Sequence, residues 1–143
     1  MNIGAFGCIF MMKKDGKYTE DISDLAGISK KQPILAFAFL IIMFSLAGIP
    51  PLGGFFAKFY VFMAVVKNEM FVLAVIGLLS TVISAFYYLK IIKTIYFEEI
   101  KIEFEQVKNL SILGTVFVSC IILTTFFLYP SFLNNLVANI FQL

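Results

Sequence analysis

A single lysine, Lys58, stands inside a long apolar stretch and is the side chain with the clearest capacity for chemistry. No charged residue occurs from Gln32 to Ala57, and apolar residues resume from Phe59 to Val66. A charged side chain at membrane depth is costly and usually has a function. A lysine poised between its charged and neutral forms can accept and release a proton, so the pattern favours a proton relay. The alternative is a lysine that snorkels to the membrane interface, but Lys58 lies several residues from the next charged residue, Lys67.

The apolar stretch that contains Lys58 must be interrupted. As one helix, residues 32–66 would be roughly 50 Å long, which exceeds a hydrocarbon core of about 30 Å. Two prolines remove backbone N–H donors, and the first restricts the residue before it, while the neighbouring glycines supply permissive backbone. The predicted helix break consists of Gly48, Ile49, Pro50, Pro51, Gly53 and Gly54.

The break predicts the surroundings of the lysine. Broken helices inside a membrane recur at ion sites of transporters. We expect Lys58 in the first turn of the second half-helix, where burial and the positive end of the helix dipole both disfavour its ammonium form. The aromatic residues that would shape a passage around it are Phe55, Phe56, Phe59 and Tyr60.

Composition independently indicates an integral membrane protein. Hydrophobic residues make up 61% of the 143 residues and charged ones 14%, against about 25% charged in soluble domains. The chain has no arginine, no histidine and no basic patch, so no nucleic-acid partner is expected. Cys8 and Cys120 lack metal-ligand spacing and are interpreted as buried thiols, so no metal site is predicted.

The predicted fold class is all-α integral membrane: the end of one helix followed by about three transmembrane segments, one of them a discontinuous helix broken by proline and glycine. Runs of about twenty apolar residues set the spans, and the lipid bilayer is their surroundings. We expect a single membrane unit over residues 1–143, with a helix tail at 1–12, a loop at 13–31, the broken helix at 32–66, a transmembrane helix at 70–89, a second charged loop at 90–108, a transmembrane helix at 109–129 and an interfacial tail at 131–143.

Lysine positions predict the topology. The two charged loops hold nine lysines, whereas the turn between the second half-helix and the next span holds Lys67 alone. By the positive-inside rule both loops face the cytoplasm or matrix. A re-entrant hairpin would return to its starting side, so the count favours a single interrupted span.

Several motifs carry a family resemblance. The segment AGIPPLGGFFAKFYVF, at residues 47–62, closely resembles the signature of the antiporter-like, proton-translocating membrane subunits of NADH-quinone oxidoreductase (respiratory complex I), in particular the subunit N family, called subunit 2 in mitochondria. The resemblance extends to NIGAF at 2–6, DLAG at 24–27, AFYYL at 85–89 and LYP at 128–130. It covers essentially the whole chain, and the central motif is specific to this subunit type.

The resemblance implies a mechanism and a setting. Members consist of inverted five-helix repeats, each with a discontinuous helix, and Lys58 matches the relay lysine nearest the outward side. The other relay residues would precede Met1, so the chain resembles the last third of the subunit and is expected to need the missing N-terminal part and the other membrane subunits of the complex. The resemblance implies no cofactor in this chain. It implies a multi-pass protein of the bacterial inner membrane, with the mitochondrial inner membrane as the alternative.

Two other functions stay open at this stage. Subunits of multi-subunit cation/proton antiporters share the Gly-Ile-Pro and Gly-Phe pattern, and sodium-driven proton exchange without NADH oxidation would identify them. A membrane scaffold that translocates nothing would tolerate replacement of Lys58 without any change in transport.

Overall fold

The computed structural model describes residues 1–14, 17–18, 21–100, 105–106 and 110–128, and within them it is almost entirely helical. This confirms the predicted fold class, including the discontinuous helix. The long helices are α1 (Asn2–Phe10), α3 (Pro33–Ala47), α4 (Gly53–Lys67), α5 (Phe71–Phe97) and α6 (Leu110–Leu128). The short elements are β1 (Met12–Lys14), β2 (Lys17–Tyr18), the 3-10 helix η1 (Ile22–Leu25), α2 (Ile28–Lys31) and β3 (Glu105–Gln106).

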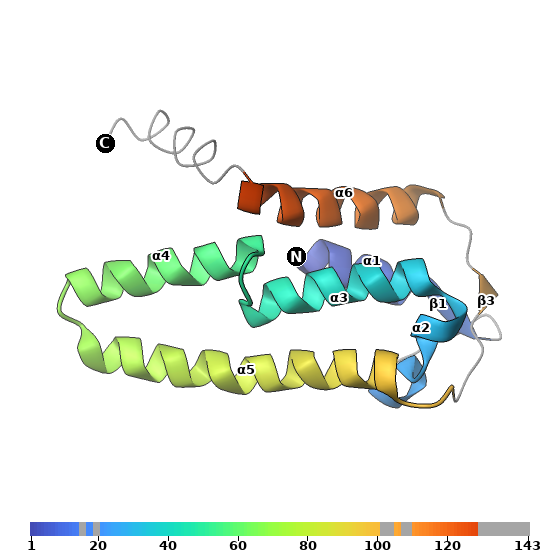
Figure 1. Cartoon of the computed structure of the whole chain (residues 1–143), viewed down its shortest axis with the longest axis horizontal. Coiled ribbons are helices and arrows are strands. Elements are labelled where there is room, and N and C mark those ends of the chain that lie inside the picture. Colours follow the sequence, from blue (N-terminus) through green and yellow to red (C-terminus); the bar gives the residue numbers. More distant parts are fainter. Residues whose placement is uncertain (15–16, 19–20, 101–104, 107–109, 129–143) are drawn as a thin grey trace.

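Helices α3 and α4 form one interrupted span. Figure 1 shows α4 continuing in the direction of α3 beyond the break, with α5 running back alongside both. The 27 residues of α5 correspond to about 40 Å, close to the thickness of a bilayer with its headgroups. Among the described helices, α5 is the one that is long and apolar enough to cross a membrane unaided.

Helix α5 is longer than predicted. The expected span ended at residue 89 and a loop was expected from residue 90, but the helix continues to Phe97 and includes Lys90 and Lys93. The final turns pack against the described part of the 13–31 connection, where Ile95 is fully buried and the Gly27 N–H donates to the Thr94 carbonyl at 3.2 Å. Lys90 and Lys93 mark where α5 leaves the apolar part of the sequence. They do not end the helix, because lysine is a good helix former.

The two charged connections meet at one end of the helices (Figure 1). There β1 pairs antiparallel with both β2 and β3 to give a small sheet. Its strands lie in segments that were predicted to be loops, except for Met12, which was expected in the helix tail at 1–12. The turn after α4 lies at the opposite end; Lys67, which was predicted to be in that turn, is the last residue of α4. The predicted interfacial tail at residues 131–143 lies outside the described part of the chain.

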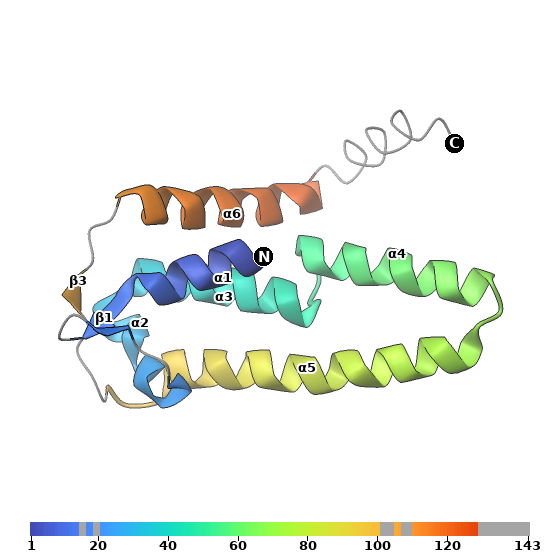
Figure 2. The ribbon, with the colours of Figure 1, turned by 180° about the vertical axis from the view of Figure 1, so that it is seen from behind.

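The core gathers around α3. Phe39 and Ile42 of α3 are buried in one cluster with Cys8 of α1, Ile95 of α5 and Val116 of α6. Seen from behind, α1 lies against α3 beside α6 (Figure 2). The outward face of α5 carries many exposed apolar side chains, as expected of a surface that meets lipid or other helices.

Candidate functional site

The carboxyl end of α3 is partly capped by backbone hydrogen bonds from the residues that follow it. Gly48 adopts left-handed geometry, with φ 83° and ψ 34°, and its N–H donates to the carbonyls of Phe44 and Ser45. The Ile49 N–H also donates to the Phe44 carbonyl, at 3.0 Å. This is a Schellman arrangement, in which glycine is favoured because it has no Cβ. It leaves the last two carbonyls of α3, those of Leu46 and Ala47, without a backbone donor from the turn.

Lys58 supplies those two bonds from α4. Its Nζ donates to the Leu46 carbonyl at 2.9 Å and to the Ala47 carbonyl at 3.1 Å. The lysine stem lies over Gly48, where an added Cβ would meet the lysine Cδ at 2.9 Å. Because backbone groups within a bilayer must find partners inside the protein, Lys58 completes the carboxyl cap of α3.

This arrangement changes one part of the predicted electrostatics of Lys58, the effect of the helix dipole. Helix α4 begins at Gly53, so Lys58 is in its second turn, and the expectation of the first turn was wrong. The side chain reaches back to the carboxyl end of α3, which is the negative end of a helix dipole and attracts a cation. The helix starts earlier than expected because Gly53 and Gly54 adopt helical geometry and do not prolong the break.

A serine makes the opposite connection across the break. Ser45 of α3 is fully buried, and its Oγ accepts a hydrogen bond from the Gly54 N–H at 3.1 Å. The Ser45 hydroxyl donates to the Met1 Sδ, also at 3.1 Å. The residue before α4, Leu52, makes no side-chain cap, so Ser45 satisfies an N–H at the start of α4 from a different helix.

Gly54 allows the two half-helices to approach closely. A Cβ at this position would overlap the backbone carbonyl oxygen of Ser45. Two side-chain connections and one backbone contact therefore join α3 to α4. We call this set of residues, Ser45, Gly48, Gly54 and Lys58, the break clamp.

Ser45 is the residue that the sequence analysis missed. It is the only polar side chain between Gln32 and Lys58, and it precedes the predicted break by three residues. A lone hydroxyl in an apolar run next to a helix end was the available signal, because such ends leave unpaired backbone groups.

Of the other predicted break residues, Ile49, Pro50 and Pro51 form the connection itself, whereas Gly53 is the first residue of α4. The helices leave residues 48–52 between them, and the peptide bond between Pro50 and Pro51 is cis. The Leu52 N–H donates to the Ile49 carbonyl at 3.3 Å, and the Phe55 N–H donates to the Leu52 carbonyl at 3.0 Å.

The four predicted aromatic residues form a continuous row of ring contacts along α4. Phe55 stacks on Phe59 with ring centroids 5.9 Å apart, and it meets Phe56 edge to face at 5.5 Å. Phe59 meets Tyr60 edge to face at 5.9 Å. Phe59 and Tyr60 are about half exposed, whereas Phe55 and Phe56 are partly buried. Their role in lining a passage stays a prediction.

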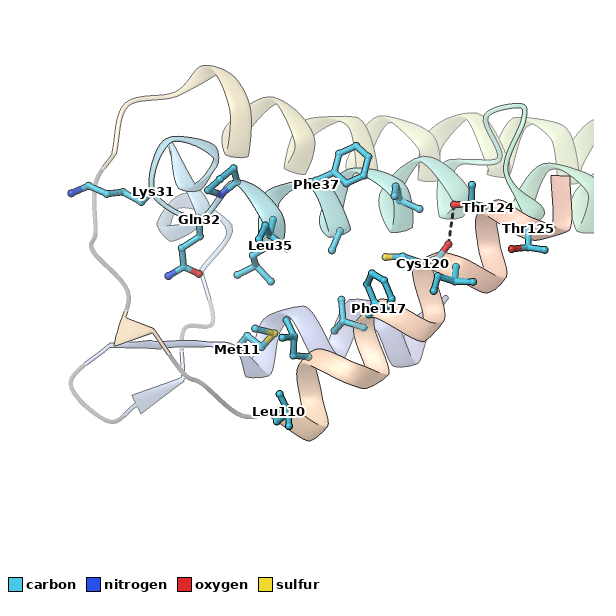
Figure 3. Close-up of a pocket in the computed structure, with 17 residues that line it drawn as sticks. Met11, Lys31, Gln32, Leu35, Phe37, Leu110, Phe117, Cys120, Thr124 and Thr125 are labelled. Carbon is cyan, nitrogen blue, oxygen red and sulfur yellow. Dashed lines mark hydrogen bonds between the residues drawn. The ribbon is translucent and has the colours of Figure 1, made fainter. Parts of the chain in front are cut away.

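A large cavity lies elsewhere, between α3 and α6, with Met11 after α1 also in its wall (Figure 3). Its volume is about 860 Å³, and its lining is mostly aliphatic and aromatic, with Lys31 and Gln32 at one end and neither Lys58 nor Ser45 in its wall. The break clamp is therefore separate from this cavity and remains the candidate site.

Comparison with known families gives a match over more than half of the chain. The family described as "NADH:quinone oxidoreductase/Mrp antiporter, TM" matches residues 1–84. This range includes all of the break, the clamp and the row of aromatic residues.

Individual relatives extend the likeness over nearly the whole chain. This chain is 50% identical over 140 residues to NADH-quinone oxidoreductase subunit N of Pelagibacter ubique. The match covers 98% of this chain and 30% of the relative. The chain is 49% identical to subunit N of Parvibaculum lavamentivorans, over 92% of this chain and 27% of the relative. The chain thus spans less than a third of the length of these relatives.

A solved structure shows the same arrangement of helices. A chain of respiratory complex I from Thermus thermophilus with bound aureothin matches with a TM-score of 0.76 and 26% sequence identity. The match covers 90% of this chain and 29% of the Thermus chain.

Proposed function

Because this chain belongs to the NADH-quinone oxidoreductase subunit N family, we propose that it is part of a proton-translocating membrane subunit in which Lys58 passes protons. Electron transfer from NADH to quinone takes place in other subunits, and this chain holds no redox cofactor. Its partners are the other membrane subunits and the part of subunit N that corresponds to the remaining length of the relatives. The relatives are bacterial, which supports a place in the bacterial inner membrane.

The observation that carries the proposal is the geometry of Lys58 at the break. It is the only charged side chain from Gln32 to Val66, and it lies where an interrupted span exposes backbone carbonyls. A lysine ammonium has three donors, and two of them are bonded to carbonyls of α3. The third proton can pass to a neighbouring water or side chain, leaving a neutral amine that keeps both carbonyl bonds. The amine lone pair then accepts the next proton.

One comparison bears on the cation/proton antiporter alternative. The matching family description names both NADH:quinone oxidoreductases and Mrp antiporters, whereas the two relatives named above, in which about half of the aligned residues are identical to this chain, are subunit N proteins. This similarity supports the oxidoreductase. Purification together with antiporter subunits, and sodium-driven proton exchange in the absence of NADH, would support the antiporter.

Replacement of Lys58 tests the proposal, and two variants separate its chemistry from its bonds to α3. Lys58→Met leaves two carbonyls without donors, which costs about 1–3 kcal/mol for each unsatisfied buried group, so less complex should assemble. Lys58→Gln keeps an amide donor but cannot carry a proton at neutral pH. We expect Lys58→Gln to assemble better than Lys58→Met and both to lower the number of protons pumped per electron in membrane vesicles supplied with NADH.

The control is Lys67→Gln, which alters the lysine in the turn at the end of α4. This variant should assemble and pump like the unmodified complex. NADH oxidation with an artificial acceptor should be the same in all assembled variants. If Lys58→Gln pumps as many protons per electron as the unmodified complex, Lys58 is not a relay and serves only to cap α3, as the scaffold alternative requires.

A further inference from the structure

We propose that Ser45 is the positioning residue for Lys58, and that its hydroxyl holds α4 in the rotation that places the lysine on the carbonyls of α3. The inference rests on the proposed relay function of Lys58. It adds a second functional side chain, on the other half-helix, which acts through the backbone of α4.

The spacing between Gly54 and Lys58 connects the two residues. They are four positions apart in α4, so they lie on the same face of the helix, one turn apart. The hydrogen bond from the Gly54 N–H to Ser45 Oγ, at 3.1 Å, fixes that face toward α3. Lys58, one turn further on, then reaches the Leu46 and Ala47 carbonyls at 2.9 Å and 3.1 Å.

The position of Ser45 suits this role. Its side chain is fully buried, and donation of its proton to Met1 Sδ orients the hydroxyl so that its oxygen can accept the Gly54 N–H. Gly54 lies directly against the Ser45 backbone, where an added Cβ would overlap the Ser45 carbonyl oxygen. In the absence of the hydroxyl, the Gly54 N–H would be unpaired in apolar surroundings and would favour a different rotation or separation of α4.

Ser84 shows that a serine in a helix of this chain need not bond to a different helix. Ser84 of α5 donates to the Ser80 carbonyl of its own helix at 3.0 Å and is partly exposed, unlike Ser45. Its removal leaves no backbone N–H of another helix unpaired. Ser84→Ala is therefore a matched control for Ser45→Ala.

The test measures protons pumped per electron by the assembled complex in NADH-energised vesicles, together with the amount of complex. We define the Lys58-dependent pumping as the difference between the unmodified complex and Lys58→Gln. Loss of one net hydrogen bond corresponds to roughly a fivefold change in a two-state population. Ser45→Ala should therefore lower Lys58-dependent pumping by up to roughly fivefold, and Ser84→Ala should leave it unchanged.

A second pair of variants isolates the hydroxyl group. Ser45→Thr and Ser45→Val add similar bulk at a packed position, but only the threonine can accept the Gly54 N–H. We expect Ser45→Thr to retain clearly more Lys58-dependent pumping per assembled complex than Ser45→Val. A structural role alone would change the amount of complex and leave the pumping per electron intact.

The outcomes separate this inference from the proposed function. If Lys58→Gln lowers pumping while Ser45→Ala pumps normally, or while the threonine and valine variants pump equally, the positioning role of Ser45 is wrong and the relay stands. If Lys58→Gln pumps normally, the relay fails and the positioning role fails with it.

Discussion

Two close contacts between helices, the break clamp and the contact of α1 with α6, differ in what faces the glycine. At the break, a Cβ on Gly54 would overlap a backbone carbonyl oxygen. At the other contact, a Cβ on Gly7 would meet the Val116 Cγ2 at 2.8 Å, and one on Gly4 would meet the Ser119 Cβ at 3.1 Å. Backbone cannot move away without shifting a helix, whereas a side chain can change its rotamer or be shortened.

The polar side chains of the two contacts differ in whether they bond to another helix or to their own helix. Ser45 and Lys58 bond to the backbone of the opposite half-helix. Beside the α1 contact, the hydroxyls of Thr115 and Ser119 donate to carbonyls of their own helix, four residues earlier. Removal of a hydroxyl there exposes no partner in another helix. Small and polar residues along a transmembrane helix thus serve close packing at one contact and backbone bonding at the other.

The largest effect is expected for Gly54→Ala. The new methyl group would force α4 away from α3 and break the bonds of both Ser45 and Lys58. Overpacking of this kind costs typically about 1–3 kcal/mol, and the lost hydrogen bonds add about 1 kcal/mol each. We expect a severe loss of assembled complex, measured by the yield of the chain in the purified complex, and loss of Lys58-dependent pumping in what assembles.

Gly114→Ala is the matched control for this substitution. Gly114 also lies in a helix, but a Cβ there would have no neighbour within 4 Å among the described residues. Alanine is favoured over glycine within a helix by about 0.8–1.0 kcal/mol, so this variant should assemble at least as well as the unmodified chain. Equal tolerance of both substitutions would contradict the close backbone contact at Gly54.

A smaller effect is expected for Gly48→Ala. Gly48 has a positive φ, and a left-handed conformation costs a residue with a Cβ roughly 1–2 kcal/mol. The methyl group would also press on the flexible Lys58 stem at 2.9 Å and displace the amine from its carbonyls. We expect moderate loss of complex and a marked fall in pumping per electron. Normal pumping by assembled Gly48→Ala would show that the observed lysine position is not needed for proton transfer.

Much of the fold could be predicted from local sequence. The two prolines and the nearby glycines predicted an interrupted span, because proline removes helical donors wherever it occurs. The end of α5 could not be predicted from hydropathy. Its last turns are stabilised by contacts with residues about seventy positions earlier, such as the bond from Gly27 to Thr94, and charge alone does not end a helix.

The candidate site was predictable in composition but not in geometry. The isolated charge of Lys58 was visible in the sequence, whereas its partners are backbone carbonyls, which any residue type supplies. The predicted influence of the α4 dipole was reversed because the long lysine side chain crosses the break to the end of α3. Ser45 was overlooked because its function depends on which N–H lies opposite, and this is fixed only when the two half-helices are packed.

The smallest effect is expected at the α1–α6 contact, with Gly7→Ala. The added methyl group would press on the end of the Val116 side chain and touch the Ile112 Cγ2 at an ordinary 3.9 Å, and the Val116 side chain can yield at a cost of about 1 kcal/mol. Heat resistance of the purified complex should fall slightly and pumping per electron should be unchanged.

The double variant Gly7→Ala/Val116→Ala, which removes the opposing methyl groups, should recover part of the loss because the two positions are in contact. Gly54→Ala should gain nothing from Val116→Ala, since its obstacle is a carbonyl of α3. If Gly7→Ala instead lowers pumping per electron as strongly as Gly54→Ala, the two contacts do not differ in kind, and proton transfer depends on helix packing throughout the chain and not on the break clamp.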